Sequence, residues 1–313
     1  MLLKREDQQA VFSFKLRGAY NKMAHLSAAQ LKKGVICASA GNHAQGVALG
    51  AHKLGTRAVI VMPVTTPQVK VDAVKSFGGE VILHGDSYSD AYTHAVTLEK
   101  KNGLTFVHPF DDPHVIAGQG TIAMELLRQH PGPIGAIYVP VGGGGLSAGM
   151  TGFLKDELSD GAFLFAEPSG APSLKKSLEA SEIVTLPKVD NFVDGAAVAR
   201  IGDLNFAALK SYSPKQVLLL PENAICVTIL DMLNVEGVVL EPAGALSIAA
   251  LDALGPDRLG GKTVVCIVSG GNFDFERLPD VKERAMRHAG LKKYFILRLP
   301  QRPGALRDFL NLL

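Results

Sequence analysis

Short apolar runs rich in β-branched residues alternate with longer helical patterns from residue 35 onward, and this alternation constrains the fold more than any other feature. Runs without polar alternation are typical of parallel strands that helices cover on both faces. The sequence therefore predicts an α/β protein with two open parallel-sheet domains. The predicted strands are VICA (35–38), AVIVM (58–62), EVILH (80–84), TFVHP (105–109), AIYVPV (136–141), FLFAE (163–167), VLLL (217–220) and TVVCIV (263–268).

These patterns divide the chain of 313 residues, which is long enough for two domains and part of a third. The last segment has an alternating run from Tyr294 to Leu299 that predicts a strand, followed by a turn and the start of a helix. So short a module cannot fold alone, and we expect it to be truncated. The expected segments are 1–33 (start of the larger domain), 34–130 (smaller domain), 131–288 (larger domain) and 289–313 (separate module).

Charge and composition limit the kinds of partner. With 32 basic and 30 acidic residues, nothing indicates a nucleic-acid or membrane surface. No apolar run reaches the roughly 18–20 residues of a membrane span, and the charged start MLLKREDQQ does not resemble a signal peptide. We expect a cytoplasmic protein with a small-molecule partner. Cys37, Cys226 and Cys266 form no CxxC pair, which predicts reduced buried thiols rather than a metal site or disulfides.

Two predicted strands run into loops that favour anion binding. After VICA, the loop contains Ser39, Gly41 and Asn42 and leads into a helix, whose unpaired N–H groups can hold a carboxylate, although a simple helix cap is an alternative. After AIYVPV come four glycines and another helix. Glycines let the backbone approach a phosphate closely, and no Walker lysine follows them, so this loop predicts a phosphate site other than that of a nucleotide triphosphate.

Two further residues complete a chemical set. Ser269 follows TVVCIV in SGGN, where its hydroxyl could meet a heteroaromatic nitrogen or cap the next segment. Lys15 follows Phe14 in VFSFKLRGAYNKM and could extend to solvent as most lysines do. Taken together, an amine, an anion cradle, a phosphate cradle and a neutral hydroxyl indicate pyridoxal phosphate held covalently by the lysine.

The motifs FSFKLRGAYN, SAGNHAQGVA, GGGGLSAG, EPAGALS and SGGN, with their spacing, resemble those of the threonine dehydratases (threonine deaminases) of the pyridoxal-phosphate fold type II superfamily, whose fold is tryptophan synthase β-like. The resemblance covers essentially the whole chain. It implies a lyase that converts L-threonine to 2-oxobutyrate and ammonia, the first step of isoleucine biosynthesis, with L-serine as a slower substrate. It also implies a homodimer or homotetramer.

The resemblance assigns roles residue by residue. Lys15 would be the catalytic and anchoring lysine, and Phe14 would lie beside the ring. Glu241, in EPAGA, belongs to a shared motif, with helix capping as the alternative. The other implied contacts are Asn42 to the ring hydroxyl, Gly142, Gly143, Gly144, Gly145 and Leu146 to the phosphate, Ser269 to the ring nitrogen, and Ser39, Ala40, Gly41 and His43 around the substrate carboxylate.

The leading alternative enzymes are an L-serine dehydratase and a serine racemase, and related families differ at single positions. Serine racemases carry SSGNH, whereas Ala40 in SAGNH cannot transfer a proton, which disfavours racemisation. Their cation site has an acidic residue six positions after a glutamate, but Ser173 follows Glu167 at that distance, so no metal site is predicted. Cysteine synthases carry threonine in place of His43. A catalytically inactive amino-acid sensor is disfavoured because Lys15, the tetraglycine and Ser269 are all present.

The two ends of the chain add expectations. YFILRLPQRPGALRDFL resembles the first strand and helix of the ACT-like regulatory domain in the short form of biosynthetic threonine dehydratases. Such domains bind isoleucine and sometimes valine as effectors, so the resemblance implies feedback control in the intact protein. Members of the family have several tens of residues before LKRED, and we therefore expect the start of the larger domain to be incomplete here.

Overall fold

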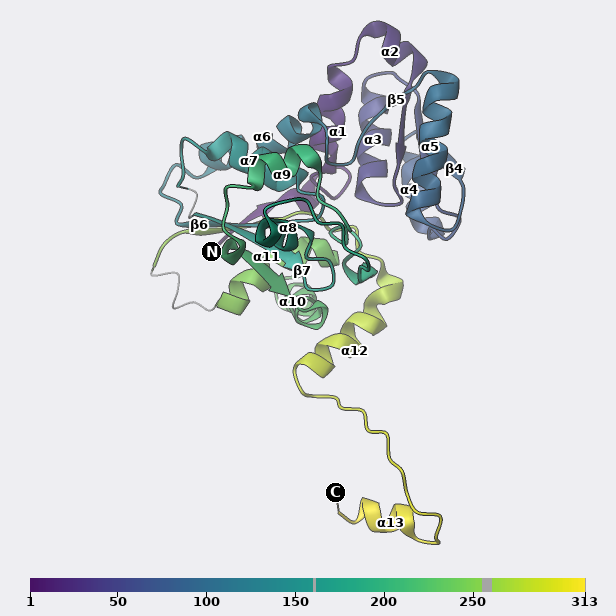
Figure 1. The fold of residues 1–313 in the computed structure, drawn as a ribbon, viewed down its shortest axis with the longest axis vertical. Helices are drawn as coiled ribbons and strands as arrows, with labels where there is room; N and C mark the ends of the chain where they lie inside the picture. The colour runs from purple at the N-terminus through teal and green to yellow at the C-terminus, as the bar shows by residue number, and fades with distance from the viewer. Residues whose placement is uncertain (160–161, 255–260, 313) are drawn as a thin grey trace.

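A computed structural model of the chain, which describes residues 1–159, 162–254 and 261–312, contains two parallel sheets, as the sequence predicts (Figure 1). The larger sheet has the order β1-β9-β6-β7-β8 and the smaller one has the order β4-β3-β2-β5. The strands are Leu2–Arg5 (β1), Val35–Ala38 (β2), Ala58–Met62 (β3), Glu80–Leu83 (β4), Thr105–Phe106 (β5), Ala136–Pro140 (β6), Phe163–Pro168 (β7), Val217–Leu220 (β8) and Val264–Val268 (β9).

Helices cover both faces of both sheets, and this explains why the strands lack polar alternation. In β9, Val264, Cys266 and Val268 enter one apolar core, while Val265 and Ile267 enter the core on the opposite face. The helices are Lys15–Ala24 (α1), Ala28–Lys33 (α2), Asn42–Lys53 (α3), Gln68–Ser76 (α4), Tyr88–Asn102 (α5), Pro113–Gln129 (α6), Gly145–Leu154 (α7), Ser173–Ala180 (α8), Asp203–Leu209 (α9), Glu222–Asn234 (α10), Pro242–Leu254 (α11), Leu278–His288 (α12) and Ala305–Leu310 (α13).

All eight predicted strands form, with ends shifted by at most three residues. One strand was missed: β1, read from the charged sequence LLKR, pairs in parallel with β9 at the edge of the larger sheet. The predicted strand from Tyr294 to Leu299 is wrong, because no ladder forms there. A strand needs a neighbour to satisfy its backbone groups, and this segment runs away from both sheets toward α13, which does form as predicted (Figure 1).

The structure also bears on the predictions for the cysteines, the domain limits and membrane spans. Cys37, Cys226 and Cys266 are free and buried, which confirms their prediction as thiols. The predicted domain limits stay predictions. Helix α6 ends just before the predicted limit at residue 130, which assigns it to the smaller domain, but it packs on α7 beside the larger sheet. Within the described ranges, no helix has both the length and the apolar character needed to cross a bilayer.

Both sheets reverse their strand order at an internal point, and these points locate the site. In the larger sheet the order changes between β6 and β9, and in the smaller one between β2 and β5. Crevices open beyond the carboxyl ends of parallel strands where the order reverses. The loops that leave β2, β6 and β9 there are the three loops that the sequence singled out.

Candidate active site

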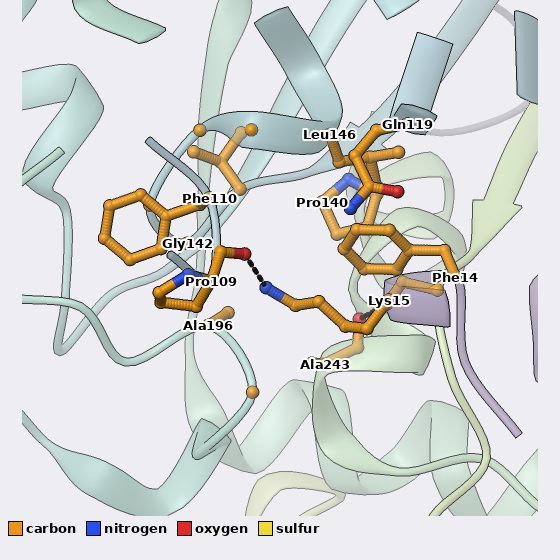
Figure 2. A pocket seen from close by; sticks show the side chains of 16 residues that line it. Phe14, Lys15, Pro109, Phe110, Gln119, Pro140, Gly142, Leu146, Ala196 and Ala243 are labelled. Atoms are coloured by element: carbon orange, nitrogen blue, oxygen red, sulfur yellow. Dashed lines mark hydrogen bonds between the residues drawn. The ribbon is translucent and has the colours of Figure 1, made fainter. Parts of the chain in front are cut away.

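Lys15 is the first residue of α1, and its side chain is partly buried. Its Nζ donates a hydrogen bond of 3.0 Å to the carbonyl oxygen of Pro109 (Figure 2). Burial lowers the pKa of this amine to about 8, while the charge of Glu241 acts in the opposite direction. The amine therefore loses its proton far more readily than an exposed lysine does, as a nucleophile or base must.

A small recess surrounds the tip of Lys15 (Figure 2). It opens toward a cavity of about 1070 Å³ lined by both sheet units, which exceeds the usual volume for one drug-sized ligand. The structure brings every predicted site residue to these walls. Lining the recess are Phe14, Lys15, Gly142, Gly143, Gly144, Gly145, Leu146 and Ser269, and Ser39, Ala40, Gly41, Asn42 and His43 line the larger cavity.

The glycine loop is shaped to hold an anionic group. Gly145 begins α7 and lines the recess, so the unpaired N–H groups of this helix start lie at its wall. Two buried atoms nearby, Gln119 Oε1 on the recess wall and Ser147 Oγ in the first turn of α7, have no hydrogen-bond partner among the described residues. Glycine backbone, an amine and unpaired polar atoms together fit a phosphate-bearing cofactor.

We expect the Gly144→Ala variant to lose about 1–3 kcal/mol of unfolding free energy. Gly144 has a φ of 90°, and an added Cβ would lie 2.9 Å from Asn205 Cβ. Urea denaturation measures the loss. Gly152→Ala is the matched control, because Gly152 lies in α7 with open space around it and alanine should stabilise a helix there by about 0.5–1 kcal/mol. Equal effects of the two substitutions would contradict the strain assigned to Gly144.

A chain of amides ends on a buried carboxylate at the wall of the larger cavity. Asn42 Nδ2 donates to Glu241 Oε1 at 2.6 Å, and Asn272 Nδ2 donates to Asn42 Oδ1 at 2.6 Å. Burial raises the pKa of Glu241 to about 7, and the nearby Asp194 adds to the effect. The sequence was compatible with either a helix-capping role or a site role for Glu241. In the described structure, its side chain accepts a hydrogen bond from Asn42 on the cavity wall, which favours the site role.

The tautomer of His43 follows from its one ring contact. Nε2 lies 2.8 Å from the carbonyl oxygen of Val107, which can only accept, so Nε2 carries the hydrogen. Burial, with the nearby charge of Lys15, lowers the pKa of the ring to about 3, which keeps it neutral. Nδ1 then has only a lone pair and cannot donate to a carboxylate. A contact between this residue and a substrate carboxylate would therefore come from its backbone N–H.

Glu167 has a structural task. Its carboxylate accepts hydrogen bonds from the N–H groups of Leu174 (2.7 Å) and Lys175 (3.0 Å) at the start of α8. Burial raises its pKa to about 7. The described residues contain no group of three or more His, Cys, Asp or Glu side chains placed to hold a metal ion.

Sequence reasoning missed several residues of the cavity wall. His108, Pro109 and Phe110 follow β5 and line the cavity, and Gln119 of α6 lines the recess. The signal was nevertheless present, because His108 and Pro109 end the predicted strand 105–109, Phe110 follows it, and the ends of parallel strands face the ligand crevice.

Comparison with known proteins places the chain. A family model described as pyridoxal-phosphate dependent enzyme matches residues 1–270. The biosynthetic L-threonine dehydratase of Bacillus subtilis is 50% identical over 312 residues, covering 99% of this chain and 74% of that protein. The enzyme of the same name from Burkholderia multivorans is 50% identical over 315 residues, covering 99% of this chain and 62% of that protein.

Solved structures give the same picture. The processed form of threonine deaminase isoform 2 from Solanum lycopersicum superposes with a TM-score of 0.86 at 46% identity, covering 90% of this chain and 82% of that one. Maize serine racemase superposes with a TM-score of 0.81 at 33% identity, covering 92% of this chain and 88% of that one. The chain is similar to both in fold and is more similar in sequence to the deaminase.

Proposed function

Because this chain belongs to the family of pyridoxal-phosphate dependent enzymes, we propose that it is a threonine dehydratase, which converts L-threonine to 2-oxobutyrate and ammonia for isoleucine biosynthesis. The observation that carries the proposal is 50% identity to a biosynthetic L-threonine dehydratase over 99% of the chain. The amine of Lys15 beside the glycine loop supports it, because the cofactor needs an amine and a phosphate site next to each other.

In this proposal, the residues that line the recess bind different parts of the cofactor. Pyridoxal phosphate, when bound, supplies a ring that withdraws electrons from an attached amino acid and so acidifies its Cα proton. Gly142 to Gly145, which line the recess, would hold the phosphate through their N–H groups, and Phe14 on the same wall would pack against the ring. Ser269 Oγ donates to the carbonyl oxygen of Ala243 at 3.1 Å and would face the ring nitrogen as a neutral group. Since a hydroxyl stabilises a positive charge less well than a carboxylate, elimination is favoured over transamination.

Lys15 moves the proton in this proposal. Its neutral Nζ takes the Cα proton of the bound substrate, and the β-hydroxyl gains a proton and leaves as water. A water molecule then hydrolyses the resulting aminocrotonate to 2-oxobutyrate and ammonia. The pKa of about 8 supports this role, because the amine is neutral in a useful fraction of molecules near physiological pH. The first turn of α3 holds the substrate carboxylate through its backbone N–H groups. The N–H groups of Ser39 and Gly41 instead donate to the carbonyl oxygen of Val61 and to Ser39 Oγ, which shapes the loop before the helix.

Ala40 supports dehydration over racemisation. The structural similarity to a serine racemase leaves both reactions within reach of the fold. Racemisation needs a second proton donor on the face opposite Lys15, and the methyl group of Ala40 on the cavity wall has no proton to give. We therefore expect no D-amino acid product from this chain.

The proposal extends to partners. L-serine is a second, slower substrate, since it has the same β-hydroxyl but lacks the methyl group. The sequence of residues 289–313 resembles part of an ACT-like module, and isoleucine or valine would act as effectors through such a module. The assembly is a homodimer or homotetramer. Size-exclusion chromatography with light scattering, with and without isoleucine, tests these points.

The experiment that tests the proposed function measures 2-oxo acid formation by the chain with added pyridoxal phosphate. We expect 2-oxobutyrate from L-threonine, slower formation of pyruvate from L-serine, and no 2-oxo acid from D-threonine. Visible absorbance of the protein-bound cofactor is followed in the same samples. Bound cofactor with no product from either L-amino acid would overturn the dehydratase assignment.

A further inference from the structure

Glu241 is a buried carboxylate for which the proposed chemistry has no use. Only 6% of the residue is exposed, and it lies directly before α11 on the side of the larger sheet. Its partner Asn42 begins α3 on the side of the smaller sheet, 199 residues away in sequence. The bond of 2.6 Å therefore joins the two sheet units at the wall of the cavity.

The loop after β9 packs closely against this bond. Glu241 N donates to the carbonyl oxygen of Gly270 in the SGGN loop. A Cβ added at Gly270 would lie 2.1 Å from Glu241 Oε1 and 3.2 Å from Asn42 Nδ2. The glycine thus allows the carboxylate and the amide to meet against the loop after β9.

The direction of the amide chain is determined at both ends. At one end Asn272 Nδ2 donates to the carbonyl oxygen of Val11 at 2.8 Å, and at the other Asn42 Nδ2 donates to Glu241. A carbonyl and an ionised carboxylate can only accept. If the amide of Asn42 turned over, its oxygen would face the Glu241 carboxylate and its NH₂ would face the NH₂ of Asn272. One orientation is therefore strongly preferred.

In this orientation, one N–H of the Asn42 amide is not used by Glu241. The NH₂ group of Asn42 has two hydrogens, and Glu241 takes one of them. Asn42 lines the cavity together with Lys15 and Ser269. The second N–H is thus available to an acceptor in the cavity, such as the ring oxygen of pyridoxal phosphate.

We propose that Glu241 is a positioning residue for the cofactor: its carboxylate locks the amide of Asn42 in the one orientation that offers an N–H to the ring oxygen. The inference rests on the proposed function, because it requires that pyridoxal phosphate occupies this cavity. Glu241 acts through Asn42 and needs no contact with the reacting atoms.

The lock depends on the charge of Glu241. A protonated carboxyl can donate as well as accept, so it no longer dictates which way the amide turns. Burial, together with Asp194, raises the pKa of Glu241 to about 7, while Lys70 of α4 and Lys15 of α1 act to lower it. The lock therefore weakens as the pH falls through about 7.

The test measures the cofactor itself rather than turnover. Pyridoxal phosphate is titrated into the cofactor-free protein, with the dissociation constant taken from absorbance and the fixed orientation of the ring from visible circular dichroism. We expect Glu241→Ala to weaken binding by roughly 10- to 100-fold, the effect of one hydrogen bond to a charged group, and to reduce the dichroism per bound cofactor. The ratio of Glu241→Gln to wild-type dissociation constants should fall toward one between pH 8 and pH 6.

Two controls make the result specific. Glu167→Gln also removes a buried carboxylate whose pKa is raised to about 7, but that carboxylate binds α8 amides, so cofactor dichroism should stay unchanged. Asn42→Ala should weaken binding as Glu241→Ala does, and the double variant should be no weaker than Asn42→Ala alone.

The outcomes separate the two proposals. Additive losses in the double variant, or wild-type affinity and dichroism in Glu241→Ala, would overturn the positioning role while leaving the dehydratase assignment intact. A wild-type protein that binds no pyridoxal phosphate would instead overturn the proposed function, and the role of Glu241 with it.

Discussion

Replacing Lys15 by methionine is expected to reduce the rate of 2-oxobutyrate formation from L-threonine by at least about 10³-fold. Methionine fills similar space but has no amine, so the variant can neither anchor the cofactor nor take the Cα proton. The rate is measured at saturating pyridoxal phosphate. Lys22→Met is the matched control, because Lys22 lies on the same helix and pairs with Asp112 at 2.7 Å. A variant that kept more than a tenth of wild-type turnover would remove Lys15 from the mechanism.

The same substitution should make the cofactor-free protein more stable at pH 7. Burial lowers the pKa of Lys15 from 10.5 to about 8, so below pH 8 the folded state holds a buried charge that methionine lacks. Between pH 8 and 10.5 the unfolded state binds more protons at this residue than the folded state, so the stability of the wild-type protein rises with pH there. Denaturant midpoints should therefore be higher for the variant at pH 7, and the difference should shrink from pH 8 to 10.5.

Replacing Arg17 by methionine is expected to lower the free energy of unfolding by about 3–5 kcal/mol. Arg17 lies in the first turn of α1 and binds Glu6 through Nε (2.7 Å) and one terminal nitrogen (2.9 Å). Both terminal nitrogens also bind Glu125 at 2.7 Å. Glu6 is fully buried. Among the described residues, its carboxylate would keep only Lys4 at 3.7 Å as a charged partner, and an uncompensated buried charge is costly.

Arg57→Met provides the comparison for that loss. Arg57 forms an equally well-made pair with Glu80, at 2.8 and 3.0 Å, but both side chains are more than half exposed. Solvent screens such a pair, so its loss should cost at most about 1 kcal/mol. Urea denaturation at pH 7 measures both variants. If both variants lost the same free energy of unfolding, the burial of Glu6 would not explain the stabilisation by the Arg17 ion pairs.

The Arg17 network also bears on the position of the lysine. Arg17 is two residues from Lys15 on α1, and its partners lie in the segment after β1 and in α6. These ion pairs connect the beginning of α1 to the larger sheet. Cofactor affinity in Arg17→Met should therefore weaken even at temperatures where the variant stays folded.

Much of the fold was open to prediction from the chain alone. The apolar runs predicted eight strands, because a parallel strand covered on both faces must be apolar on both, and this leaves a local signature. The missed strand β1 and the strand that does not form at 294–299 show the limit of that signature. LLKR becomes a strand because β9 offers it an edge, whereas the better alternating pattern near Tyr294 has no neighbour.

The site divides in the same way. Its chemistry could be predicted from the sequence, since Lys15, the four glycines and Ser269 each carry their chemical capability in the residue itself. The glycines and Ser269 also follow strands whose ends converge. The hydrogen-bond partners of these side chains could not be predicted from the sequence. The bond between Asn42 and Glu241 joins residues 199 positions apart in the sequence. The tautomer of His43 depends on the carbonyl oxygen of Val107, which lies in the loop directly after β5.

The sequence by itself therefore determined the layers of the fold and the reactive groups that could meet in a crevice. The tertiary structure alone decided which buried polar atoms face each other and what burial does to their pKa values. The physical reason is that periodicity reports which surface of an element leaves water, a local property of the chain. Hydrogen bonding and desolvation depend on neighbours within a few ångströms, and folding brings those neighbours from distant parts of the chain.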